Sequence, residues 1–160
     1  MPKLLIVLLT IILVTSCGQP NYINTSKTLD LTLFTIETPK TWTLINDGIN
    51  YDSGKIAIDV NDTLNYKYYV DSSSKYRMRS FIPKEDMYNA SLNASYEDAI
   101  NGKKVIVIIP KKTGNGITGI IIDSLYSANS NNNKFELVGT NLKASNEKAF
   151  KQAIKTIKFH

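Results

Sequence analysis

The feature that most restricts the fold of this chain is the regular alternation of apolar and polar residues along much of its length. Such alternation is typical of a half-buried β-strand, because successive side chains point to opposite faces of a sheet. It predicts strands over residues 31–36, 56–60, 64–70, 104–109, 117–125 and 134–139, with a short extended piece over 42–44. We therefore expect a mainly antiparallel sheet.

Turn-forming residues separate two pairs of these strands. Asn61-Asp62 stands between the second and third predicted strands, and PKKTGNG (residues 110–116) stands between the next two. Asn, Asp and Gly favour tight turns, so each pair is expected to form a hairpin. The strands over 104–109 and 117–125 are apolar on both faces over several residues, which favours the centre of the sheet.

The chain ends in a different period. Apolar residues from Ala149 to Ile157 are spaced by three and four, and Ser145 stands where an N-cap is expected. Lysines lie beside this stripe and complement the helix dipole near its C-terminal end. Residues 83–90 predict a second, short helix. The fold class is therefore α+β: a mainly antiparallel sheet with a C-terminal amphipathic helix packed on one face.

The apolar positions of these elements predict one core. Trp42 is expected in it as a core aromatic rather than as a binding residue. The predicted core consists of Phe34, Ile36, Trp42, Ile56, Ile58, Leu64, Tyr66, Val105, Val107, Ile121, Leu137, Phe150, Ile154 and Ile157.

The amino-terminal region is a targeting segment by its pattern. Lys3 precedes an uncharged apolar run over residues 4–14, which suits a signal peptide but is shorter than the ~20 residues of a membrane span. Val14-Thr15-Ser16-Cys17 follows and resembles the lipobox of bacterial lipoproteins. The resemblance implies cleavage between Ser16 and Cys17, a diacylglyceryl group on the Cys17 thiol, and an acylated new amino terminus such as a palmitoyl amide. The alternative is an ordinary signal peptide with an incidental cysteine.

Three segments follow from this reading. Residues 1–16 are a cleaved signal peptide, 17–28 a lipidated amino terminus and flexible tether, and 29–160 a single globular domain. The resemblance places the domain on the cell envelope, anchored to the membrane by lipid. Residue 18 is Gly and not Asp, so in a Gram-negative host we expect the outer membrane with the domain facing the periplasm. In a host with one membrane, the anchor holds the domain on the cell membrane.

A second resemblance concerns residues 34–42, FTIETPKTW. They are similar to the opening F-x-I-x-x-P-x-x-W strand of the PsbP/Mog1-like family. The later order, a GKK strand, an apolar hairpin strand and a last helix ending in TIKF, is also similar to small uncharacterised bacterial lipoproteins of that shape. The resemblance implies a binding or assembly factor without a common set of catalytic residues.

The residue inventory offers little for catalysis. The one histidine is His160, the last residue, and the one cysteine is Cys17, which the lipid would occupy. No catalytic residue, cofactor or metal site is predicted. Gly114, Gly116 and Gly119 precede a strand, so they indicate a turn rather than a nucleotide loop. For the acidic cluster, the alternatives are calcium ligation and turn formation, and the residue types favour turns. That cluster is Asp47, Asp52, Asp59 and Asp62, with Asn46, Asn50 and Asn61 between them.

One cationic cluster suggests a contact site. Lys75, Arg77 and Arg79 alternate and would share one face of an extended segment. Arginine can bind an anionic group in a bidentate manner, and Tyr66, Tyr68, Tyr69 and Tyr88 lie near enough in sequence to stack on a ligand. The alternative is a solvated strand face, paired with acids such as Glu85 and Asp86. Nucleic acid is not expected, because the formal net charge is only +5.

Two function classes stay open. The first is a non-enzymatic, membrane-anchored partner-binding or accessory/assembly factor of the cell envelope. The second is a small-ligand or glycan-binding lipoprotein that uses the tyrosine and arginine residues. A concave, tyrosine-lined pocket would favour the second class, and a flat exposed apolar patch the first.

Overall fold

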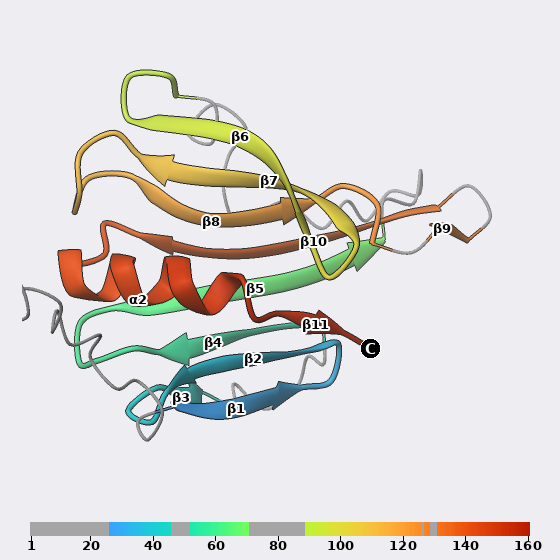
Figure 1. Ribbon diagram of the computed structural model, residues 1–160, viewed down its shortest axis with the longest axis horizontal. Coiled ribbons are helices and arrows are strands. Elements are labelled where there is room, and N and C mark those ends of the chain that lie inside the picture. The colour runs from blue at the N-terminus through green and yellow to red at the C-terminus, as the bar shows by residue number, and fades with distance from the viewer. Residues whose placement is uncertain (1–25, 46–51, 71–88, 126, 129–130) are drawn as a thin grey trace, which may run out of the picture.

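The fold is given by a computed structural model that describes residues 26–45, 52–70, 89–125, 127–128 and 131–160 (Figure 1). One helix and eleven strands lie within these residues. In chain order they are β1 (Ser26–Leu31), β2 (Phe34–Pro39), β3 (Thr43–Ile45), β4 (Ser53–Ala57), β5 (Thr63–Val70), β6 (Asn93–Ile100), β7 (Lys103–Pro110), β8 (Ile117–Ile122), β9 (Ser127–Ala128), β10 (Asn131–Thr140), α2 (Ala144–Ile154) and β11 (Lys158–Phe159). This is a mainly antiparallel β-sheet protein with one short C-terminal helix, as the α+β prediction requires.

The larger sheet has the strand order β3-β4-β5-β10-β8-β7-β6, and β9 pairs with the start of β10. Every pairing is antiparallel. β10 lies between β5 and β8 and so joins the two predicted hairpins, β4–β5 and β7–β8. Both hairpins form, but β4 spans 53–57 rather than the predicted 56–60, so the first turn covers residues 58–62 and not Asn61-Asp62 alone. All six residues of β8 are buried, in agreement with its expected central place.

A smaller sheet of order β1-β2-β11 and the helix α2 lie over one face of the larger sheet (Figure 1). Phe34 of the smaller sheet packs edge-to-face on Phe135, with ring centroids 5.0 Å apart, and on Tyr66, at 5.7 Å. Trp42 lies 6.4 Å from Phe150 of α2. Every predicted core residue is buried. Ile121 differs in its place, since it belongs to a smaller cluster on the opposite face with Ile108, Ile117 and Val138.

The first predicted strand is wrong in its extent. Residues 31–36 contain the end of β1, a turn and the start of β2, because Leu31 pairs with Phe34 across a two-residue turn. The sequence carries the reason: Leu29, Leu31 and Leu33 hold odd positions, whereas Phe34 and Ile36 hold even ones. The apolar residues change from odd to even positions here, which is expected where one strand ends and the chain turns into the next. β1 also begins at Ser26, so residues 26–28 of the expected tether are in a strand.

β6 and β11 were not predicted. β6 is largely exposed, with only its first and last residues buried, so its sequence lacks a clear apolar face. It forms a hairpin with β7 through Asn101 and Gly102, whose φ angles are +49° and +72°. Positive φ at both turn residues is the geometry that an Asn-Gly pair favours in a two-residue hairpin.

The start of α2 differs from the expectation. Ser145 is the second helical residue, and the N-cap position is held by Lys143, whose side chain makes no cap hydrogen bond. The turn between β4 and β5 supplies the cap instead: the Lys143 amide donates to Asp62 Oδ2 at 2.9 Å. Asn146 Nδ2 donates to Asp59 Oδ2 and Asp62 Oδ2, at 2.8 Å each. The short helix predicted over 83–90 falls largely outside the described residues.

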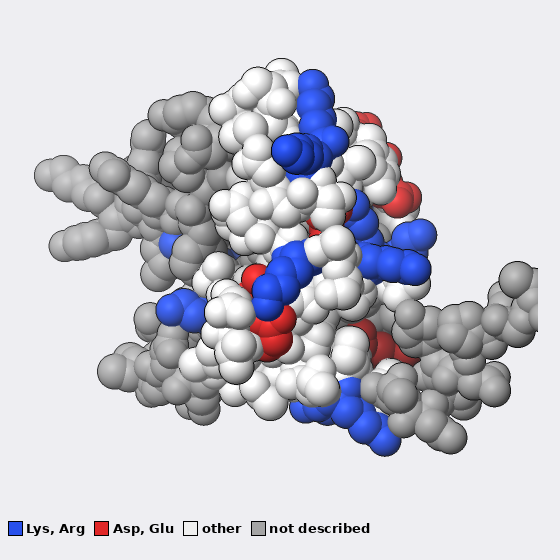
Figure 2. Space-filling view, turned by 90° about the vertical axis from the view of Figure 1, so that its left-hand side faces the viewer, with Lys and Arg blue, Asp and Glu red and all other residues white. Residues whose placement is uncertain are grey.

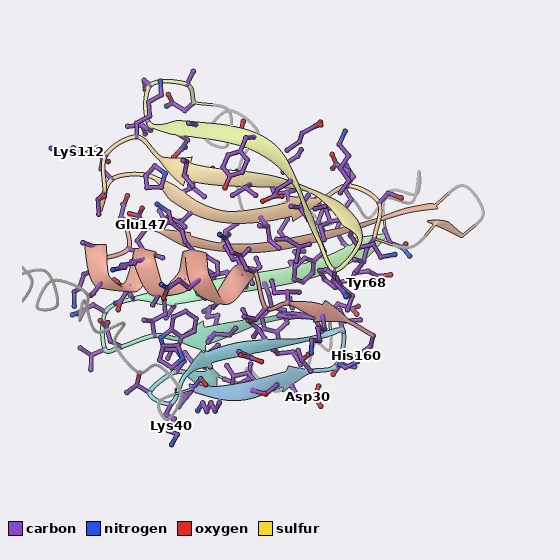
Figure 3. All side chains as sticks on the ribbon, viewed as in Figure 1. Asp30, Lys40, Tyr68, Lys112, Glu147 and His160 are labelled. Atoms are coloured by element: carbon purple, nitrogen blue, oxygen red, sulfur yellow. The ribbon has the colours of Figure 1, made fainter. Side chains whose placement is uncertain are left out.

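Charged side chains lie at both ends of the strands. Figure 3 shows Lys40 and Lys112 at the end where β2 and β7 finish, and Asp30 and His160 at the opposite end. Figure 2 views the first end directly, with lysine side chains spread across it and carboxylates beside one of them. An ion pair joins Lys143 Nζ to Asp59 Oδ2, at 3.4 Å, at the start of α2.

Candidate functional site: a groove between the helix and the sheet

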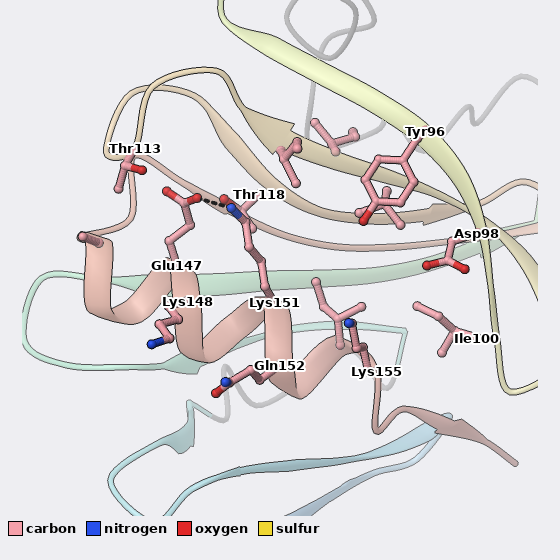
Figure 4. Close-up of a pocket in the computed structure, with 15 residues that line it drawn as sticks. Tyr96, Asp98, Ile100, Thr113, Thr118, Glu147, Lys148, Lys151, Gln152 and Lys155 are labelled. Atoms are coloured by element: carbon pink, nitrogen blue, oxygen red, sulfur yellow. Dashed lines mark hydrogen bonds and ion pairs between the residues drawn. The ribbon is translucent and has the colours of Figure 1, made fainter. Parts of the chain in front are cut away.

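A groove of about 450 Å³ lies between α2 and the strands β6, β7 and β8 (Figure 4). It exists because α2 packs against β8 and β2, while the larger sheet continues beyond the helix to its edge strand β6. We call this the helix–sheet groove. Its volume falls within the range of about 300–1,000 Å³ that is usual for small-molecule sites.

The apolar part of the lining comes from both walls. Val107 and Ile109 contribute from β7, Ile100 from the end of β6, and Ile154 from the last turn of α2. Val107, Ile100 and Ile154 are also members of the core, so the apolar surface of the groove rests on rigid packing. A ligand with an apolar body would bury that body against these side chains.

The helix wall carries charged residues on one side. Glu147, Lys151 and Lys155 are four residues apart, and Lys148 lies beside them. Residues at this spacing fall on one face of a helix. The Glu147 Oε1 atom accepts from Lys151 Nζ in an ion pair (Figure 4). Lys148 and Lys155 are exposed, so the rim of the groove is basic.

Glu147 is the unusual member of this wall. Its side chain is only 5 % exposed, and its Oε2 atom is buried without a hydrogen-bond partner among the described residues. A buried polar atom that lacks a partner costs roughly 1–3 kcal/mol, so such atoms are uncommon in folded proteins. A carboxylate oxygen accepts hydrogen bonds, so Glu147 keeps one buried acceptor that no described residue uses.

The β6 wall supplies an aromatic ring and a carboxylate. Tyr96 pairs with Val107 and Asp98 pairs with Val105, so both side chains lie on the face of the sheet that carries α2. Tyr96 is half exposed, and Asp98 accepts from the Ala99 amide at 2.8 Å. In Figure 4 Tyr96 and Asp98 stand across the groove from the helix lysines. A tyrosine ring and a facing lysine suit contact with a planar or amphipathic molecule.

The residues predicted as a contact site have different outcomes. Lys75, Arg77, Arg79 and Tyr88 lie outside the described residues, as do Ser16 and Cys17. Tyr66 is a core residue, and Tyr69 donates from its hydroxyl to the buried Glu136 at 2.8 Å. Tyr66 therefore has no ring face to offer a ligand. Of the predicted contact residues that the structure describes, Tyr66, Tyr68 and Tyr69, none lines the helix–sheet groove.

The acidic cluster behaves as a turn and a helix anchor. Asp47 is outside the described residues; Asp59 accepts from the amides of Asn61 and Asp62 at 2.8 Å. The pKa of the Asp59 carboxyl is held well below its usual range. The main cause is the hydrogen bond from the Asn61 amide, and the side chain of Asn146, the amide of Asp62 and the ammonium of Lys143 add to it. Within the described part of the chain, no group of three or more metal-ligating side chains is present.

Sequence reasoning missed Glu147 and Tyr96 as groove residues. The pair Glu147 and Lys151, four apart, was a visible signal for an ion pair on one helix face. The spacing does not show which side of the helix faces strands β6 and β7, where the groove lies. Tyr96 lies in strand β6, which the sequence did not predict, so its position opposite α2 could not be predicted either.

Comparison with known proteins adds no family. A scan against protein-family models finds no match, and a search of curated proteins finds no similar chain. Among the described residues, no helix has both the length and the apolar character needed to cross a bilayer.

Proposed function

We propose that this chain is a lipid-anchored protein of the bacterial cell envelope that binds a small amphipathic ligand in the helix–sheet groove without converting it chemically. The observation that carries the binding role is Glu147, a buried carboxylate in the helix wall of the groove whose Oε2 atom has no hydrogen-bond partner among the described residues. The groove is concave and contains Tyr96, the kind of pocket that favours ligand binding over a flat partner surface.

The anchor rests on sequence. The apolar run over 4–14 and the Val14-Thr15-Ser16-Cys17 pattern support cleavage before Cys17 and acylation of its thiol and amino group. Several acyl chains exceed the two membrane signals that stable anchoring needs. In a Gram-negative host we propose the outer membrane with the domain facing the periplasm, and in a host with a single membrane, the cell membrane.

The finer fold assignment is also a proposal. The PsbP/Mog1-like resemblance is supported by the FTIETP segment forming a strand, β2, and by Trp42 lying buried just after it. A C-terminal helix on an antiparallel sheet fits that family in outline.

The lining indicates which chemical groups a ligand would carry. An apolar body could cover Val107 and Ile109, and a hydroxyl or amine could donate to Glu147 Oε2 if the side chain turns this buried atom toward the groove. An anionic group would lie best at the rim beside Lys155 and Lys148.

Binding of anilinonaphthalene sulfonate, which has an apolar aromatic body and one sulfonate, tests the groove. Two exposed lysines give a matched pair of variants: Lys155 lines the groove, whereas Lys158 lies in β11 and does not. We expect Lys155→Glu to weaken probe affinity about tenfold, a change of about 1.4 kcal/mol, and Lys158→Glu to leave it within about twofold. Fluorescence titration at low salt measures both.

Equal loss of affinity in the two variants would show that the probe responds to overall charge and not to the groove. Unchanged affinity in both would remove the helix–sheet groove as the binding site.

A partner-binding role is the second candidate, and one observation favours it. Leu44 and Ile45 are exposed, at 40 % and 36 %, on β3, which is the edge strand of the larger sheet opposite β6. An exposed apolar edge strand is a common place for another chain to pair. In that role Lys75, Arg77 and Arg79 stay proposed as contacts for an anionic partner.

A further inference from the structure

We infer that the end of the domain where β1 begins faces the membrane and docks on anionic phospholipid headgroups. This end carries Ser26, the β4–β5 turn and the β7–β8 loop, and we call it the anchor end. The inference rests on the proposed lipid at Cys17 and adds an orientation and a contact surface to it.

The length of chain between the lipid and the first strand sets the distance. Nine residue steps separate Cys17 from Ser26, and even a fully extended chain of that length spans at most about 30 Å. Ser26 is the first residue of β1 and lies at the same end as Pro39 of β2, its pairing partner. The anchor end is therefore the part of the domain that the lipid holds nearest to the bilayer.

The charge of the anchor end suits an anionic surface. Lys40, Lys111 and Lys112 are exposed there, and Lys40 and Lys112 are seen at this end in Figure 3. Two acids at this end, Asp59 and Asp62, form hydrogen bonds or an ion pair with Lys143 and Asn146. The opposite end carries exposed Asp30 (Figure 3), and its lysines include Lys158 and Lys104, which forms an ion pair with Glu97. Lysines close to an anionic membrane are attracted to it over about one Debye length.

The anchor end also presents an apolar side chain. Val60 is 97 % exposed at the tip of the β4–β5 turn. The Asp59 carboxylate fixes this turn by accepting from the amides of Asn61 and Asp62. A shallow hollow of about 620 Å³ lies beside it, lined in part by Trp42 and Ile58. A rigid turn with an apolar tip among lysines is suited to the headgroup–acyl boundary.

Site-specific fluorescence tests this orientation in the lipidated mature protein reconstituted in vesicles. Cys17 is the only cysteine and its thiol is acylated in this proposal, so a Val60→Cys variant takes a single bimane label. Thr32→Cys, in the exposed β1–β2 turn at the opposite end, is the matched control. We expect headgroup-level doxyl lipids to quench the label at position 60 but not at 32 in phosphatidylglycerol vesicles. Quenching should fall in phosphatidylcholine vesicles and at high salt.

Charge removal gives the second arm. A Lys40→Gln, Lys112→Gln pair in the Val60→Cys background should lower the docked-to-undocked ratio by up to about 25-fold, since each lysine near an anionic surface contributes about fivefold. A Lys104→Gln, Lys158→Gln pair, with the same loss of charge, should leave it nearly unchanged. The inference is wrong if the labels at positions 60 and 32 are quenched equally, or if the two pairs of lysine substitutions have equal effects. Flotation of the protein with vesicles in that case would still support the lipid anchor. If the wild-type protein does not float with vesicles, the anchor and this inference both fail.

Discussion

At the scale of single residues, the aspartates of the β4–β5 turn show what residue type does and does not reveal. Asp59 and Asp62 were predicted as turn formers, and the Asp59 carboxylate does accept the amides of Asn61 and Asp62. Their second role, holding the first turn of α2 through Asn146 and the Lys143 amide, joins residues more than eighty positions apart. Turn propensity is local, so no sequence pattern near residue 60 points to that partner.

This junction predicts how acid acts on the fold. The hydrogen bonds to Asp59 favour its charged form in the folded state, so its pKa is lower there than in the unfolded chain. Its stabilising effect is therefore complete above about pH 4, the ordinary value, and is lost as the pH falls further. Asp59→Asn keeps an acceptor oxygen but removes this titration. We expect the difference in free energy of unfolding between wild type and Asp59→Asn to stay constant near neutral pH and to shrink in acid, in urea titrations at a series of pH values. A difference that does not change with pH would show that the charge of Asp59 has no part in the junction.

At the scale of elements, the sequence predicted those with a strong apolar period and missed those without one. β4, β5, β7, β8, β10 and α2 each bury a regular set of residues, and all were expected. β6 buries only Asn93 and Ile100, so it has no apolar face of its own. Its hydrogen bonds with β7 hold it in the sheet instead. The Asn101-Gly102 pair is a local signal for a hairpin turn, but apolar periodicity alone does not reveal it.

The docking of α2 gives a prediction for one element. Phe150 is fully buried against Trp42, so Phe150→Ala should lower the free energy of unfolding by about 3–5 kcal/mol. Lys148→Ala, an exposed position two residues earlier, should change it by no more than about 0.5 kcal/mol. Trp42 is the only tryptophan, so its fluorescence reports both the unfolding and the altered contact. A silent Phe150→Ala variant would mean that this face of α2 does not hold the helix on the sheet.

At the scale of the whole molecule, the sequence predicted the fold class and the core but not the site. The core needs only residues of the right type on the right faces, and all fourteen expected members are buried. The helix–sheet groove instead depends on the position of α2 across a sheet whose edge strand was unknown. Glu147, beside Lys151 on the helix wall of that groove, can be recognised as a groove residue only when the opposite wall is known.

For the whole molecule, the central proposal is that lipid at Cys17 holds the domain on a membrane. Metabolic labelling with an alkyne fatty acid, followed by mass analysis of the amino terminus, tests it directly. The wild-type chain is predicted to carry label and to begin at acylated Cys17, while Cys17→Ala is predicted to carry none and to remain uncleaved between residues 16 and 17. Label persisting on Cys17→Ala, or a mature wild-type chain with an unmodified Cys17 thiol, would contradict the account.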